Sequence, residues 1–250
     1  NLATLIVDPD GKGLESHWQK TSQSLLVGVI LHALYQALET GIQATLPGID
    51  AMLANPDRDI AELWMEMLTY GHIKGRNHPV VGSAARDMMD RPDEEAGSVL
   101  STAKSYLSLY RDPTVGHNVS ASEFKIRDLM NHDNPVSLYI VTQPNDKARL
   151  RPLVRVMVNM IVRLLADKME FENGRPKAHY KHRLLMMLDE FPSLGRLEIL
   201  QESLAFIAGY GIKCYLICQD VNQLKSRETG YGLDESITSN CHVQNAYPPN

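Results

Sequence analysis

The spacing of hydrophobic residues changes twice along the chain. Residues 2–7 form an almost continuous apolar run, which predicts a strand buried on both faces. Asp8 and a Pro-Asp-Gly turn follow it. From residue 14 to about residue 130, apolar residues recur at every third or fourth position, which predicts helices and no strand.

Three helices are well marked in this middle region. The first spans residues 14–39 and ends near Gly41, which can adopt the left-handed conformation of a C-cap. The second spans residues 56–70, and the third begins at Pro92. Residues 14–132 are therefore expected to be all helical.

The last part of the chain alternates β-rich runs with helical patterns. The predicted strands are 136–143, 184–189, 212–219 and 241–247, and the predicted helices are 146–169 and 197–208. Such alternation with short connections indicates a parallel sheet. The expected fold class is α/β, in which residues 1–13 and 133–250 form one domain around an all-α insert of residues 14–132.

Composition narrows the class of protein. The chain has 250 residues, of which 44% are hydrophobic and 22% charged, which is typical of globular proteins. The net charge is −5, so bulk charge gives no support for a freestanding binder of duplex DNA. Three cysteines without a C-x-x-C motif argue against a disulfide framework and against a zinc site.

One stretch could be considered as a membrane span. Residues 21–38 contain no Asp, Glu, Lys or Arg, but only residues 25–31 are continuously apolar. Polar side chains occupy much of the remainder, which favours a buried helix. The chain begins with Asn1 directly before a strand-like run, so it is expected to be a fragment that begins upstream.

The motif LLMMLDEF, residues 184–191, places two adjacent carboxylates after an apolar run. In open α/β sheets, ligands bind at the carboxyl ends of the strands, where Asp189 and Glu190 would lie. Nucleotide hydrolysis requires such groups, one to hold the water shell of Mg²⁺ and one to polarise the attacking water. The alternative, a strand end followed by a solvated turn, stays open on these residues alone.

A basic loop precedes this motif. Arg175, Lys177, Lys181 and Arg183 surround Tyr180, a composition compatible with contacts to single-stranded DNA. A solvated loop without such contacts is the favoured interpretation.

Three longer stretches carry a family resemblance. They are DPDGKGLESHWQKTSQSLLVGVILHALY, LLMMLDEFPSLGRLEILQESLAFIAGYGIK and YLICQDVNQLKS, and they resemble the TraG-like conjugative coupling proteins of type IV secretion systems. The similarity spans nearly all of the chain. The resemblance implies a RecA-like P-loop NTPase fold with an all-α insert, assembled as a homo-hexameric ring. It also implies a protein of the bacterial inner membrane whose soluble part, including this chain, lies in the cytoplasm. Such a ring brings a relaxase–DNA complex or a secreted protein to the secretion channel.

The resemblance also implies roles for particular residues. Residues 184–191 become the Walker B strand, with Asp189 as the ligand of Mg²⁺ through water and Glu190 as the acid that activates the attacking water. Gln219 matches the glutamine that the family places near the γ-phosphate, and an amide there could both donate and accept hydrogen bonds. Without the resemblance, Gln219 would be an ordinary residue at a strand exit.

The phosphate-binding loop of such an enzyme is missing from these residues. No G-x-x-x-x-G-K-[ST] occurs, since Gly11-Lys12 is followed by Gly13. ATP and Mg²⁺ are therefore expected to bind only to a longer protein, and this chain alone is predicted to be inactive. No residue is assigned as an arginine finger, because Arg196 and Arg227 are only the arginines nearest to the expected position in the sequence.

Two functions are compatible with the sequence. In one, the chain is the greater part of an ATP-driven motor that moves DNA or protein. In the other, the all-α region is a non-catalytic module that docks substrate or relaxosome proteins. A chromosome-segregation or packaging motor is disfavoured by the match of DGKGLESHW and ICQDVNQL to the secretion proteins. The cargo and the oligomeric state of this piece are left open.

Overall fold

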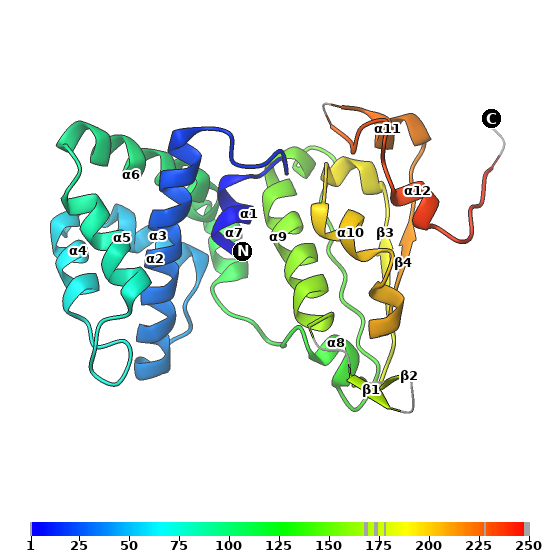
Figure 1. Ribbon diagram of the computed structural model, residues 1–250, viewed down its shortest axis with the longest axis horizontal. Helices are drawn as coiled ribbons and strands as arrows, with labels where there is room; N and C mark the ends of the chain where they lie inside the picture. Colours follow the sequence, from blue (N-terminus) through cyan, green and yellow to red (C-terminus); the bar gives the residue numbers. More distant parts are fainter. Residues whose placement is uncertain (1, 168–169, 173–174, 178, 228, 248–250) are drawn as a thin grey trace. The chain divides into compact units, whose positions relative to one another are not determined.

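The computed structural model describes residues 2–167, 170–172, 175–177, 179–227 and 229–247. The chain divides into two compact units, Asn1–Glu123 and Phe124–Asn250, which are described separately (Figure 1). The domain limits expected from the sequence are residues 1–13, 14–132 and 133–250. They describe functional domains and not compact units, and they stay a prediction.

The regular elements among the described residues of the first unit are all helices, apart from a single β-bridge. Its elements are α1 (Leu2–Val7), α2 (His17–Thr40), α3 (Leu46–Ala54), α4 (Ile60–Thr69), α5 (Pro79–Met89), α6 (Asp93–Leu107), the 3₁₀ helix η1 (Ser108–Arg111) and α7 (Pro113–Val119). Helix α2 is the centre of the unit, since α1, α5 and α6 all pack against it. Ser16 and Gln19 cap its start reciprocally, and Gly41, with φ of 75°, ends it as predicted.

The uncharged stretch 21–38 lies inside this unit. Leu25, Leu26 and Val29 are almost fully buried, which confirms the predicted buried helix. Gly28 allows α5 to approach closely, because an added Cβ would lie 2.4 Å from the Cβ of Ala84. Among the residues that the structure describes, no helix has the length and apolar content needed to cross a membrane.

The predicted strand at residues 2–7 is wrong, since these residues form helix α1. A short apolar run cannot be assigned to strand or helix by periodicity alone. No described strand lies beside it, so its N–H groups are satisfied within a helix, whose buried side packs against α2. Gln19 Nε2 donates to Val7 O at 3.3 Å and fixes the end of α1.

The second unit combines helices with a parallel pair of strands, which confirms the α/β class. Its elements are α8 (Asp128–Asn131), α9 (Lys147–Leu165), β1 (Glu170–Glu172), β2 (Arg175–Lys177), β3 (Leu184–Leu188), the 3₁₀ helix η2 (Phe191–Leu194), α10 (Glu198–Ser203), the 3₁₀ helix η3 (Ile207–Tyr210), β4 (Ile212–Leu216), α11 (Val221–Lys225) and α12 (Ile237–Asn240). Strands β3 and β4 are parallel and in register from Leu184↔Ile212 to Leu188↔Leu216. The short strands β1 and β2 form an antiparallel pair.

Burial in this sheet is one-sided, which corrects the prediction of a strand buried on both faces. Met186 is buried in the core with Ile161 of α9 and Leu200 of α10. On the opposite face, Leu185 and Met187 are 56% and 63% exposed. The helices α9 and α10 therefore pack on one face of the two-stranded sheet.

Two further predicted strands are wrong. Residues 136–143 and 241–247 contain no described strand, and Tyr139 and Tyr247 are 83% and 85% exposed. Both runs are rich in residues that favour strands, but a strand also needs a neighbour to accept its hydrogen bonds. No described strand pairs with either run.

Candidate functional site

The hydrogen-bond pattern between the two parallel strands becomes irregular at their carboxyl ends. Ile217 N donates to Leu188 O at 3.1 Å, and a regular parallel ladder would next join Glu190 N to Ile217 O. The bond to Ile217 O instead comes from Phe191 N, at 2.8 Å. One extra residue is thus inserted after β3, as in a β-bulge, and the bulge re-aims Glu190.

Glu190 itself has left-handed backbone angles, with φ of 49° and ψ of 44°. A residue with a Cβ pays about 1–2 kcal/mol for this conformation. The adjoining Phe191 is 1% exposed, so its burial together with the bond to Ile217 holds the bulge in place. Strain of this kind is concentrated at functional sites.

The bulge brings together two residues that the sequence separates by 29 positions. Gln219 Nε2 donates to Glu190 Oε2 at 2.8 Å. Directly after Gln219, Asp220 caps α11 and shares a capping box with Gln223. The cap fixes the direction in which the chain leaves β4, and this places Gln219 beside Glu190.

Asp189 lies exposed at the same edge. Its Oδ1 accepts the N–H of Glu190 at 3.0 Å. A carboxylate in this position is a suitable partner for the water shell of Mg²⁺. Among the described residues, however, no group of three or more His, Cys, Asp or Glu is arranged to hold a metal ion, so Asp189 would supply only part of such a site.

Two residues that the sequence did not single out support the turn after Glu190. Arg155 of α9 is 3% exposed, and its Nη1 donates to Leu194 O at 2.7 Å. The hydroxyl of Tyr231 accepts the N–H of Leu197 at 3.0 Å, and its ring stacks on Phe191 with 5.9 Å between centroids. Burial raises the pKa of Tyr231 to about 12, so the hydroxyl stays protonated. No sequence motif marks either residue.

The basic loop lies at the other end of the strands. The ring of Tyr180 lies over Gly211, where an added Cβ would come within 2.4 Å of its Cζ. Lys181 Nζ binds Asp133 Oδ1 at 2.5 Å, and Arg183 is exposed. The side chains of Arg175 and Lys177 lie outside what the structure describes. Contact with single-stranded DNA stays a prediction for these residues.

The two arginines considered as fingers differ in their surroundings. Arg196 forms a loose ion pair with Glu198 at 3.9 Å, whereas Arg227 is exposed beyond α11. Neither position assigns the role.

Conjugal transfer protein TraG of Escherichia coli is 84% identical over 250 residues, which is 100% of this chain and 39% of that protein. Protein VirD4 of Agrobacterium fabrum is 31% identical over 138 residues, which is 55% of this chain and 19% of that protein. The chain thus spans less than half of these relatives.

Solved structures share the fold. The plasmid coupling protein TrwB, in complex with ADP and Mg²⁺, superposes with a TM-score of 0.62 and 20% identity, covering 95% of this chain and 50% of that one. TrwBdeltaN70 with sulphate gives the same TM-score. The family described as Type IV secretory system Conjugative DNA transfer matches residues 1–250. The chain therefore belongs to this family of conjugative DNA transfer proteins.

Proposed function

We propose that this chain is part of a coupling protein that energises conjugative transfer by ATP hydrolysis, with a RecA-like P-loop NTPase fold completed by the rest of the protein. The observation that carries the proposal is the hydrogen bond between Glu190 and Gln219 at the carboxyl ends of two parallel strands. The TrwB complexes with ADP and Mg²⁺ and with a non-hydrolysable ATP analogue support a nucleotide as the ligand.

The three polar residues would divide the chemistry among them. Mg²⁺-bound ATP supplies the phosphoryl group when it is present. Asp189 would hold a water of the Mg²⁺ shell, and Glu190 would accept a proton from the attacking water through its carboxylate. Gln219 already donates to Glu190, and its carbonyl oxygen could accept a hydrogen bond from the same water. The pair would thus orient water and base together.

Family membership supports a proposal for the partners. We infer a homo-hexameric ring at the cytoplasmic face of the bacterial inner membrane. It would receive a relaxase–DNA complex or a secreted protein and pass it to the channel subunits. The phosphate-binding loop, absent from these 250 residues, would come from the remainder of the protein.

The test uses the chain extended to the full length of its TraG relatives. Glu190→Gln should lower Mg²⁺-dependent ATP turnover by about 10²–10⁴-fold while nucleotide binding persists, because only the proton acceptor is lost. Glu202→Gln is the matched control, an exposed glutamate on α10, and should leave turnover unchanged. Turnover that is indifferent to Glu190→Gln would refute the catalytic role.

A second function is supported by the division of the chain. Residues 1–123 form a compact helical unit of their own, as expected of a docking module. Produced alone, this unit should retain binding to relaxosome proteins or secreted substrates if docking is its task. A folded unit without such binding would remove this alternative.

A further inference from the structure

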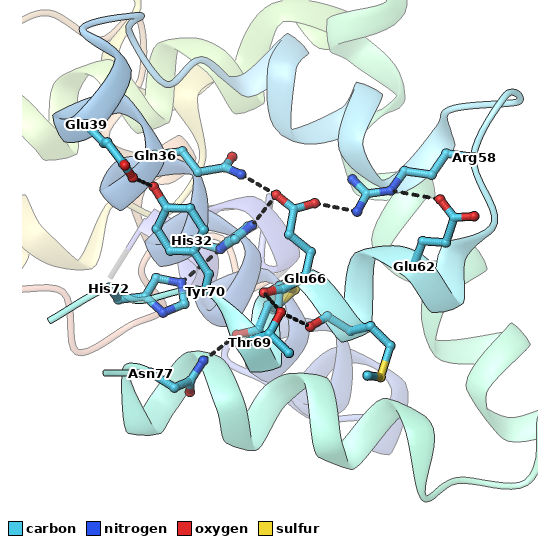
Figure 2. Close-up of polar contacts among 12 residues, drawn as sticks. His32, Gln36, Glu39, Arg58, Glu62, Glu66, Thr69, Tyr70, His72 and Asn77 are labelled. Atoms are coloured by element: carbon cyan, nitrogen blue, oxygen red, sulfur yellow. Dashed lines mark hydrogen bonds and ion pairs between the residues drawn. The ribbon is translucent and has the colours of Figure 1, made fainter. Parts of the chain in front are cut away.

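A chain of polar side chains crosses the interior of the helical unit (Figure 2). His32 on α2 is 0% exposed, and His72, in the turn between α4 and α5, is 7% exposed. Their nearest ring nitrogens, His32 Nδ1 and His72 Nε2, lie 2.9 Å apart. The chain continues to Glu66 of α4, because His32 Nε2 lies 3.3 Å from Glu66 Oε1.

The backbone fixes where the protons lie. The N–H of His78 donates to His72 Nδ1 at 3.2 Å, so this nitrogen carries no proton. The proton of neutral His72 is then on Nε2 and is donated to His32 Nδ1. His32 in turn carries its proton on Nε2 and donates it to Glu66. All four ring nitrogens are used, and both rings are neutral.

An additional proton displaces an existing hydrogen bond wherever it is placed in this arrangement. On His72 Nδ1 it would face the N–H of His78, and on His32 Nδ1 it would face the N–H of His72. Passing the proton along from His32 to His72 only moves the conflict to His78. One proton therefore breaks one hydrogen bond of the chain, whichever ring receives it.

Glu66 does not remove this conflict. Besides His32, its carboxylate accepts hydrogen bonds from Gln36 and Arg58, so its charge is already compensated (Figure 2). Burial opposes ionisation of Glu66, but the hydrogen bonds and charges of Arg58 and His32 together outweigh it and lower the pKa of the carboxyl. Glu62 shares Arg58 at 3.9 Å.

One neighbouring acceptor, the backbone carbonyl of Tyr70, faces the ring of His72 and raises its pKa, but burial and the neighbouring histidines outweigh this effect. The rings of Tyr35, Tyr70 and His78 surround His72, and the hydroxyl of Tyr70 is already donated to Glu39. His78 Nδ1 accepts the N–H of Val80 as the cap of α5. The turn itself adds two positive charges, Lys74 and Arg76.

We propose that the His32–His72 pair is a proton-sensitive lock: uptake of one proton at acidic pH breaks the hydrogen-bonded chain and releases the basic turn 72–76 from α2. The lock joins α2, α4 and the start of α5 within one unit. Its opening would change the surface that this turn presents.

The direction of the pH effect follows from linkage. Burial lowers the pKa of His32 against the opposing effect of Glu66. Burial also lowers the pKa of His72, and the neighbouring His32 and His78 lower it further. In the unfolded chain a histidine titrates near pH 6.5, so the unfolded state takes up protons first as the pH falls. The stability from the neutral pair is complete above about pH 6.5 and is lost as the pH falls through the folded-state values.

Hydrogen exchange on the 250-residue chain tests the lock. After correction for intrinsic exchange rates, the protection of the His78 amide should fall by about tenfold or more between pH 7.5 and pH 5.5. The amide of Val158, buried in α9 of the second unit, should keep its protection over the same range. An unchanged protection factor at His78 would overturn the proposal.

A variant provides the second readout. His72→Gln cannot take up a proton, and it should remove most of the decrease in melting temperature between pH 7.5 and pH 5.5, about 5 °C in the unmodified chain. His117→Gln, which replaces an exposed histidine of the same unit, should leave the decrease as it is. Equal pH dependence in the His72→Gln variant and the unmodified chain would contradict the lock. Should the variant not fold, the exchange measurement decides alone.

Discussion

Glu190 combines an unfavourable backbone conformation with the side-chain contact that the proposed chemistry needs. Its φ of 49° is the consequence of the bulge, and the bulge directs its carboxylate to Gln219. Local strain that persists beside a well-packed Phe191 is expected where geometry serves a function.

Glycine at this position should therefore be more stable than alanine. Glu190→Gly is expected to exceed Glu190→Ala in free energy of unfolding by about 1 kcal/mol, since only glycine adopts the left-handed region freely. Urea denaturation of both variants measures the difference. The opposite order, which is usual within helices and strands, would show that Glu190 is not strained.

Close packing at Gly28 gives a second test at this scale. Gly28→Ala should lower the free energy of unfolding by about 1–3 kcal/mol, because the new Cβ would lie 2.4 Å from the Cβ of Ala84. Gly97, in the middle of α6, has nothing within 4 Å of an added Cβ. Gly97→Ala should raise the free energy of unfolding by about 0.5–1 kcal/mol. Thermal unfolding measures both variants, and a stabilised Gly28→Ala or a destabilised Gly97→Ala would contradict the prediction.

At the scale of elements, the turn η2 depends on a contact from α9. Replacing Arg155 by Met would leave Leu194 O without its buried donor and should cost about 1–3 kcal/mol. Hydrogen exchange at Ser193 and Gly195, whose amides close this turn, should accelerate in the variant. Arg149→Met removes an exposed ion pair with Asp146 on the same helix and should change stability by about 0.5 kcal/mol or less. Similar losses in both variants would contradict the role of Arg155.

Periodicity predicted the elements that carry their own signals. The helix predicted at residues 14–39 is observed at His17–Thr40, with Ser16 as its N-cap and Gly41 directly after it. Residues 2–7 and 136–143 have no such signals, and their structure depends on whether a neighbouring strand is present. A single sequence does not contain that information, so the first became a helix and the second an unpaired segment.

The candidate site could also be predicted only in part from the sequence. Asp189, Glu190 and Gln219 were named from the motif and its family resemblance. The bulge, by contrast, arises from hydrogen bonds between two strands, and Arg155 and Tyr231 act across the fold. The His32–His72 pair also joins residues 40 positions apart, so nothing in the local sequence indicates it.

At the scale of the whole molecule, the chain holds one half of the proposed catalytic apparatus. Asp189, Glu190 and Gln219 would contribute the metal-water and proton-accepting groups, and the phosphate-binding loop would come from the remaining part of a protein more than twice as long. The helical unit adds a separate body with its own core and its own polar interior. The proposed motor with a docking module would account for both units.

The most direct measurement is a double-mutant cycle on ATP turnover in the protein extended to the length of its TraG relatives. The four proteins are the unmodified one, Glu190→Gln, Gln219→Ala and the double variant. If Glu190 and Gln219 act on the same water, each single change lowers turnover, and the double variant is no slower than Glu190→Gln. Losses that multiply independently would show that the pair does not act as a unit, and full activity in Glu190→Gln would contradict the account altogether.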